Sequence, residues 1–190
     1  MRSSPVVISG RRHRLAVIVA AVLAVIVCMP ANASVILRDP YSGGDTWSYD
    51  DCGFGVDVTG TYGGVFSIRT GPDPDTFFAH DSYWFREIHR RRSDGRIGIV
   101  EGKGTFREVQ AIPVSGTVYE FRAVNAGQLF TVRDADGDLL LRDSGMIDAT
   151  VRFDTLGDQQ PGGELIAELD TVFRGRFPSL GADLCAMWTA

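Results

Sequence analysis

The chain has 190 residues, of which 44% are hydrophobic and 23% are charged, with a formal net charge of −5. This balance is typical of a folded globular protein and excludes a disordered chain. Its acidic excess gives no general electrostatic attraction to nucleic acid or to an anionic membrane, so we expect neither as a partner.

The first 33 residues have the order of a secretory signal peptide. Four arginines come first, an apolar run at 15–29 follows, and Ala31, Asn32 and Ala33 complete the pattern. The run is 15 residues long, shorter than the roughly 20 that a spanning helix needs. We therefore predict a signal peptide at 1–33, cleaved after Ala33, a secreted, extracellular protein and no retained membrane span. The general secretory route is favoured over twin-arginine export, to which the pair Arg11-Arg12 points, and Cys28 leaves a lipid-modified N-terminus as an alternative.

Cleavage after Ala33 leaves residues 34–190, a chain of 157 residues with a net charge of −9. That length suits one domain with its own core. Removal of Cys28 leaves Cys52 and Cys185, which we predict to form one disulfide that joins the two ends of the domain. Two buried free thiols are the alternative, whereas a redox-active pair is disfavoured because the chain has no Cys-x-x-Cys spacing.

Alternation of apolar and polar residues dominates the predicted domain. It is clearest at 118–124 and 146–154, and it is weaker at 54–59, 65–70, 77–90, 96–109 and 129–142. Residues 164–174 alternate as well, although Leu165, Leu169 and Val172 would also share a helical stripe, so a strand is favoured and a helix stays open there.

Strong turn signals separate these segments. They are Gly63-Gly64, Gly71 to Pro74, Ser93-Asp94-Gly95, Asp136-Gly137 and residues 157–163. Short strands and turns in regular succession predict an all-β domain of about 8 to 10 antiparallel strands, either a β-barrel or a β-sandwich. Gly98, Gly102 and Gly104 would share one strand face, where aromatic cover or a bend favours the barrel.

Several short motifs resemble those of a set of small secreted actinobacterial proteins that remain uncharacterised. The motifs are Asp39-Pro40-Tyr41, Tyr49-Asp50-Asp51-Cys52, residues 116–121, residues 154–158 and Asp183-Leu184-Cys185. The resemblance would cover nearly the whole predicted domain. It implies an exported single domain with paired terminal cysteines, and it supplies no activity and no site residues.

The sequence contains no recognisable catalytic motif. It has no Gly-x-Ser-x-Gly elbow, no phosphate-binding glycine loop and no dinucleotide fingerprint, so we predict no cofactor. No metal is predicted either, because His80 and His89 lack close-spaced ligand partners. A triad that combines one of these histidines with a distant serine and an acid stays open.

Asp134, Asp136 and Asp138 alternate as they would in a calcium loop. However, Leu139 follows where an EF-hand has glycine, so a plain Asp-Gly hairpin turn is favoured.

A basic cluster forms the candidate site for an anionic surface polymer. It comprises His89, Arg90, Arg91, Arg92 and Arg96, around a predicted hairpin tip. The alternative is a solvated hairpin end whose charges protect a sheet edge.

Aromatic residues are dense between positions 47 and 85. They would fill the core or line a barrel mouth that holds a small apolar molecule. Taken together, the sequence predicts a secreted, non-enzymatic binding module. A hydrolase-like secreted enzyme with an unrecognised site and a structural cell-surface protein are the alternatives, and the oligomeric state is left open.

Overall fold

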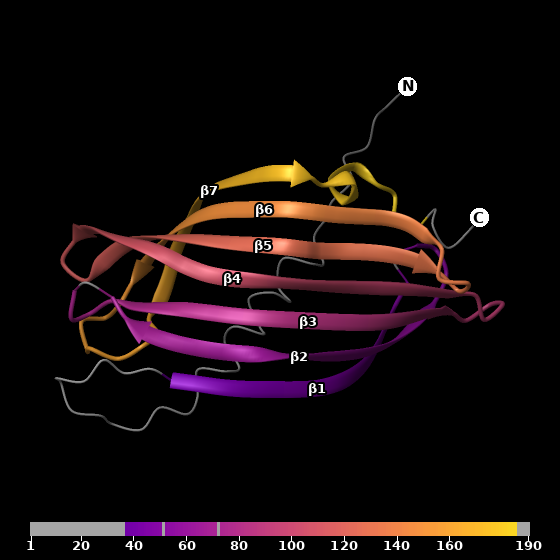
Figure 1. The fold of residues 1–190 in the computed structure, drawn as a ribbon, viewed down its shortest axis with the longest axis horizontal. Coiled ribbons are helices and arrows are strands. Elements are labelled where there is room, and N and C mark those ends of the chain that lie inside the picture. The colour runs from indigo at the N-terminus through magenta and orange to yellow at the C-terminus, as the bar shows by residue number, and fades with distance from the viewer. Residues whose placement is uncertain (1–36, 51, 72, 186–190) are drawn as a thin grey trace. The chain divides into compact units, whose positions relative to one another are not determined.

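The computed structural model describes residues 37–50, 52–71 and 73–185. The predicted signal peptide at 1–33 lies outside these residues. The described chain forms seven strands and one short 3-10 helix (Figure 1): β1 Leu37–Tyr49, β2 Val56–Thr70, β3 Phe77–Arg91, β4 Ile97–Ser115, β5 Val118–Asp134, β6 Leu139–Asp154, β7 Glu164–Arg176 and η2 Pro178–Gly181. No described residues form a helix long and apolar enough to cross a bilayer.

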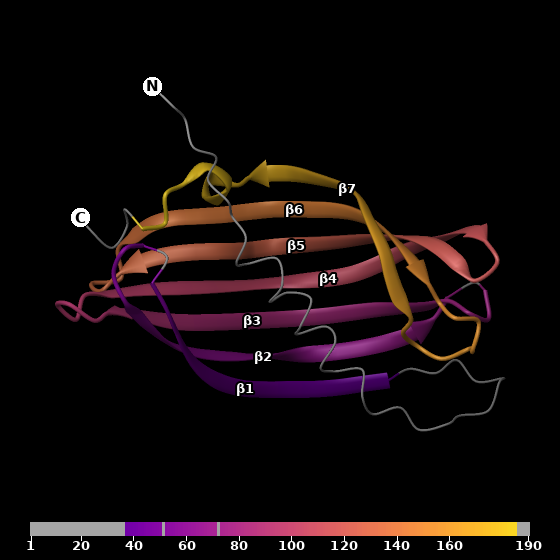
Figure 2. The same cartoon turned by 180° about the vertical axis from the view of Figure 1, so that it is seen from behind.

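The strands form one antiparallel sheet in which every strand pairs with its neighbour in the sequence, in the order β1 to β7. Figures 1 and 2 show that this sheet is curved and that its two edge strands bend toward the same side. The all-β prediction is confirmed. The finer expectation is corrected, because among the described residues there are seven strands in one open sheet, neither 8 to 10 strands nor two packed sheets, and β1 does not pair with β7 to close a barrel.

The strands are fewer and longer than predicted because two glycines lie inside a strand instead of making a turn. Gly63 and Gly64 belong to the continuous strand β2. A Cβ built on Gly63 would lie 3.1 Å from the Trp84 ring, and one on Gly64 would lie 2.6 Å from the Tyr41 hydroxyl. Glycine is used here because neighbouring aromatic rings lie directly over the backbone.

Aromatic cover also explains the glycines of β4. Gly102 pairs with Phe85 and Gly104 with Tyr83, and Gly98 shares the same face. A Cβ on Gly102 would come within 2.6 Å of the Phe85 ring. The predicted shared face is therefore confirmed, although the sheet stays open.

Strand β7 settles the ambiguous segment after residue 163 in favour of a strand. It pairs along its length with β6, with register shifts at Thr150/Val151 and Arg152/Phe153. The helical alternative is wrong.

The sheet has one apolar and one polar face. The register places Val56, Val58, Val100 and Val132 on the same face, each with at most 3% of its surface exposed. We call this the apolar face. Burial of such a side chain contributes about 1.5–3 kcal/mol, so this face carries much of the stability. The opposite face, which includes Ser67 and His80, is called the polar face.

The predicted disulfide is confirmed. Cys52 and Cys185 are bonded with their Cα atoms 5.3 Å apart, at a sequence separation of 133. Cys52 packs against the core cluster of Val100, Val132 and Leu141. The chain before Cys185 is anchored as well, because the Ser179 backbone N–H donates to Asp143 Oδ1 over 3.0 Å.

Candidate functional site: an arginine-rich depression on the polar face

Sheet register brings together four residues that are widely separated in the sequence. Arg38 on β1 stands opposite Ser67 on β2, Ser67 opposite His80 on β3, and His80 opposite Arg107 on β4. Directly opposite residues on neighbouring strands have Cβ atoms about 4.5–5.5 Å apart. These four residues therefore form one row across four strands, and we call it the cross-strand row.

A shallow depression lies along this row. One part, of about 370 Å³, is lined by Ser67, Ile68, Arg69, His80 and Arg107. A second part, of about 340 Å³, is lined by Arg38, Val65, Ser67, His80 and Ser82. Ser67 and His80 line both parts, so they mark the centre of the depression.

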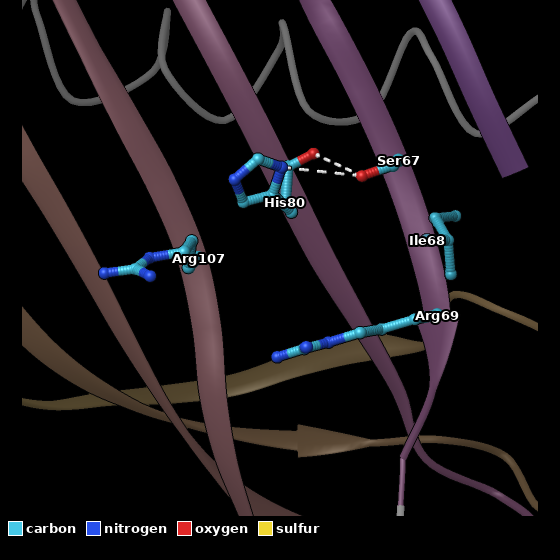
Figure 3. Close-up of a pocket in the computed structure, with 5 residues that line it drawn as sticks. All are labelled: Ser67, Ile68, Arg69, His80 and Arg107. Carbon is cyan, nitrogen blue, oxygen red and sulfur yellow. Dashed lines mark hydrogen bonds between the residues drawn. The ribbon is translucent and has the colours of Figure 1, made fainter. Parts of the chain in front are cut away.

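The centre has a defined local geometry. Ser67 Oγ lies 3.5 Å from His80 Nδ1 and 3.4 Å from the His80 carbonyl oxygen. Figure 3 shows the two side chains facing each other from neighbouring strands, with the long side chain of Arg69 extending below them. The Arg69 guanidinium lies 5.7 Å from the centroid of the Phe78 ring, which holds it across β3.

The arginines of the depression differ from the others on the polar face in their partners. Arg122 binds Asp148, Arg133 binds Glu101 and Arg152 binds Glu120. Within the described part of the chain, Arg38, Arg69 and Arg107 form no such ion pair, and all three are exposed. Three uncompensated guanidinium groups around a hydroxyl and an imidazole form a surface suited to an anion.

The basic cluster predicted around the hairpin tip is arranged differently, because acidic residues already bind most of its arginines. Arg91 Nε donates to Asp94 Oδ1 over 2.8 Å, and Arg96 Nε lies 3.4 Å from Asp94 Oδ2. Arg92 Nε donates to Asp57 over 2.8 Å. The Arg91 hydrogen bond lowers the pKa of Asp94 to about 2, so this carboxylate stays charged at any ordinary pH. Within this tip, the structure leaves only the exposed Arg90 without an ion pair among the described residues.

His89 does not lie on the surface of this cluster. It is 4% exposed and shares the apolar face with Val58. Its Nε2 lies 2.8 Å from Glu87 Oε2, and its Nδ1 lies 3.1 Å from the Tyr49 hydroxyl. The alternation of β3 explains the separation, since residues 89 and 90 point to opposite faces.

The two histidines each meet part of a catalytic set, on opposite faces of β3. His80 meets the hydroxyl of Ser67, but no described carboxylate hydrogen-bonds to His80. His89 meets the carboxylate of Glu87 and the hydroxyl of Tyr49. Because the two imidazoles lie on opposite faces of β3, the Ser67 hydroxyl and the Glu87 carboxylate do not meet at one imidazole.

Polar groups also lie among the aromatic residues of the apolar face. The Tyr41 hydroxyl donates to Asp81, and the Tyr83 hydroxyl donates to Asn125 Oδ1 over 3.0 Å. Burial raises the pKa of Asp81. Glu108 accepts a hydrogen bond from the Ala79 backbone N–H over 2.6 Å, and burial raises its pKa to about 7.

The predicted hairpin at residues 134–138 has the geometry of a closed turn. Asp134 Oδ1 accepts the backbone N–H groups of Asp136 and Asp138, over 3.0 and 2.8 Å. Gly137 has φ of +88°, which glycine adopts without strain. The Asp134 carboxylate thus stabilises the turn itself, and within the described residues no cluster of three or more metal-binding side chains is found.

Sequence reasoning did not find the cross-strand row. Arg38, Ser67 and Arg107 carry no motif, and only the strand register shows that they are neighbours. The one available signal is that each is a polar residue in an alternating strand.

Comparison with known proteins gives no match: no family model, no curated protein and no solved structure resembles this chain.

Proposed function

We propose that the protein is a secreted, non-enzymatic binding domain whose extracellular ligand carries phosphate or sulfate groups. The observation that supports this proposal most directly is the cross-strand row, together with Arg69. Guanidinium groups bind tetrahedral oxyanions through paired N–H donors, and the hydroxyl of Ser67 adds another donor at the centre.

The secreted part of the proposal rests on the N-terminal sequence pattern. The disulfide between Cys52 and Cys185 is consistent with an oxidising compartment. The resemblance to small secreted actinobacterial proteins points the same way. The non-enzymatic part is supported by the separation of His80 and His89 onto opposite faces of β3, which keeps the Ser67 hydroxyl and the Glu87 carboxylate apart.

The site differs from the one that the sequence suggested. At the hairpin tip, an anion would have to compete with Asp94 and Asp57 for the arginines. In the depression no described carboxylate forms an ion pair with Arg38, Arg69 or Arg107, so binding there displaces only water.

The proposal is tested by titrating the purified protein with pyrophosphate, with inorganic sulfate and with a poly(glycerol phosphate) chain, using calorimetry at low and high salt. We expect salt-sensitive binding, which Arg38→Ala or Arg107→Ala weakens about tenfold. Ser67→Ala should also weaken it without changing the charge. Stronger binding of the polymer than of pyrophosphate would identify an anionic polymer as the ligand. Stronger binding of pyrophosphate would identify a small free anion.

Arg90→Ala is the matched control, because it removes the same charge from an exposed arginine of the hairpin tip. It should leave the affinity unchanged. Absence of binding by all three probes, or an equal loss in Arg90→Ala, would contradict the proposed site.

A small apolar ligand is the second candidate. It is favoured by Tyr62, which lies on the apolar face yet is 44% exposed beside Tyr41, with ring centroids 6.5 Å apart. Native mass spectrometry of freshly purified protein would reveal a retained apolar molecule, and a mass equal to that of the protein alone would remove this candidate.

A further inference from the structure

The two edges of the sheet are protected very differently. An edge strand presents unpaired N–H and C=O groups that can pair with another chain. Strand β1 contains Pro40, Gly43 and Gly44 together with charged residues, features that discourage such pairing. Strand β7 contains no proline, and its apolar residues Leu165, Ile166, Leu169, Val172 and Phe173 are 38 to 54% exposed.

The charges of β7 follow an ordered pattern around Val172. Alternate residues along the strand are Asp170, Val172, Arg174 and Arg176, so an acid comes before the valine and two arginines follow it. These four residues stand opposite polar-face residues of β6, which places them on one face of the sheet, whereas Glu168 stands opposite Val151 beyond a register shift and lies on the other face. All four are exposed.

This pattern is complementary to itself when the strand is reversed. If a second β7 lies antiparallel with the two Val172 residues opposite each other, Asp170 faces Arg174. Twofold symmetry makes this pair twice. Opposite charges placed directly across two strands stabilise their pairing.

The pKa of Asp148 on β6 is lowered chiefly by its hydrogen bond to Arg122 and in smaller part by the nearby charge of Arg174, so the main partner of that carboxylate is Arg122. The ion pairs of the described residues do not include Glu168, Asp170, Arg174 or Arg176. On the other side of the strand the same register brings Thr171 opposite Phe173, which covers part of the exposed apolar surface.

We propose that β7 pairs antiparallel with β7 of a second copy of this chain, about a twofold axis at Val172. The contact is isologous and therefore closes at a dimer. It extends the sheet across both protomers and satisfies the unpaired backbone groups of both β7 edges.

Charge reversal tests the pairing. The variant Asp170→Arg carries only arginines at the paired positions 170 and 174, and Arg174→Asp carries only acids there. Each variant alone should dimerise at least about tenfold more weakly than the unaltered protein in sedimentation equilibrium. An equal mixture of the two should form a heterodimer, because every charged pair is then restored.

The matched control is Asp158→Arg/Glu164→Arg, which reverses two acids near the start of β7 that face no charged residue in this register. It should dimerise like the unaltered protein. A monomer at about 100 µM, a dimer unaffected by the charge reversals, or a mixture that does not associate would each overturn the proposal.

A cysteine at the symmetry axis gives a second measurement that does not depend on charge. Val172→Cys should form a disulfide-linked dimer under mild oxidation, since the axis places each copy of residue 172 beside its mate. Leu165→Cys, on the same strand and more exposed at 54% against 38% for Val172, should remain unlinked. Equal cross-linking of both variants would contradict the register.

Discussion

Tyr41 and Asp81 join two strands that are not neighbours. The Tyr41 hydroxyl on β1 donates to both carboxylate oxygens of Asp81 on β3, over 3.1 and 2.8 Å. Strand β2 lies between them, and the contact is possible because Gly64 leaves room for the tyrosine ring. Burial, together with the hydrogen bond to Asp81, raises the pKa of Tyr41, so the hydroxyl keeps its proton and remains a donor.

The first prediction concerns this glycine. A Cβ at position 64 would lie 2.6 Å from the Tyr41 hydroxyl oxygen and 2.5 Å from the Ser82 carbonyl oxygen, and the backbone atom cannot easily move. We expect Gly64→Ala to lower the free energy of unfolding by about 1–3 kcal/mol, measured by urea denaturation. Gly181→Ala is the control, because its Cβ would meet open space and the free energy of unfolding should change little. Gly53 is unsuitable as a control site because it has a positive φ. A stable Gly64→Ala protein would show that the tyrosine does not lie over this residue.

The second prediction concerns Glu108. Because burial raises its pKa from 4.5 to about 7 in the folded state, the folded protein holds a proton that the unfolded chain releases between these values. Stability should therefore fall as the pH rises from about 4.5 to about 7, by on the order of 2 kcal/mol, and the loss ends above that window.

Glu108→Gln keeps a carbonyl oxygen for the Ala79 N–H but cannot ionise. We expect it to be more stable than the unaltered protein at pH 8 and about equally stable at pH 4, as measured by urea unfolding midpoints at both values. If Glu108→Gln and the unaltered protein differed in stability by the same amount at pH 8 and pH 4, titration of Glu108 could not be the cause of the pH dependence.

The third prediction concerns the disulfide. In the chain-entropy model, closing a loop of this length stabilises the fold by roughly 4–5 kcal/mol. Replacing both cysteines, in Cys52→Ser/Cys185→Ser, should lower the free energy of unfolding by that order. Reduction of the unaltered protein should produce a similar loss, while reducing agent should leave the double variant unchanged.

The fourth prediction concerns the hairpin tip. Arg91 lowers the pKa of Asp94 to about 2, so nuclear magnetic resonance titration of its carboxyl carbon should show a midpoint near that value. Replacement of Arg91 by alanine removes the largest cause of the shift and should move the midpoint back toward 3.8. Replacement of Arg90, which does not bind Asp94, should leave it unchanged.

The same tip shows why charge in a sequence is a poor guide to charge at a surface. His89, Arg90 and Arg91 are consecutive in the sequence, but the strand turns them to alternate faces, and Asp94 then binds Arg91. The disulfide and the strand character of most segments could be predicted, because cysteine number and alternation are local properties of the chain.

The cross-strand row could not be predicted, because it depends on register. Arg38 and Arg107 become members of one site only because Ser67 and His80 stand between them on intervening strands. The number of strands was overestimated for a related reason. Glycine pairs favour turns in isolation, but Gly63 and Gly64 are covered by aromatic side chains from other strands, which the local sequence does not reveal.

The position of the disulfide also determines how the fold would respond to mechanical tension. Strand β1 lies before Cys52, whereas β2 to β7 lie between Cys52 and Cys185. A force pulling on the two ends of the chain would pass through the sulfur–sulfur bond and bypass those six strands. Only β1 could be peeled away, so a protein under load would lose this one edge strand. The site residues on β2 to β4, Ser67, His80 and Arg107 among them, would stay in register.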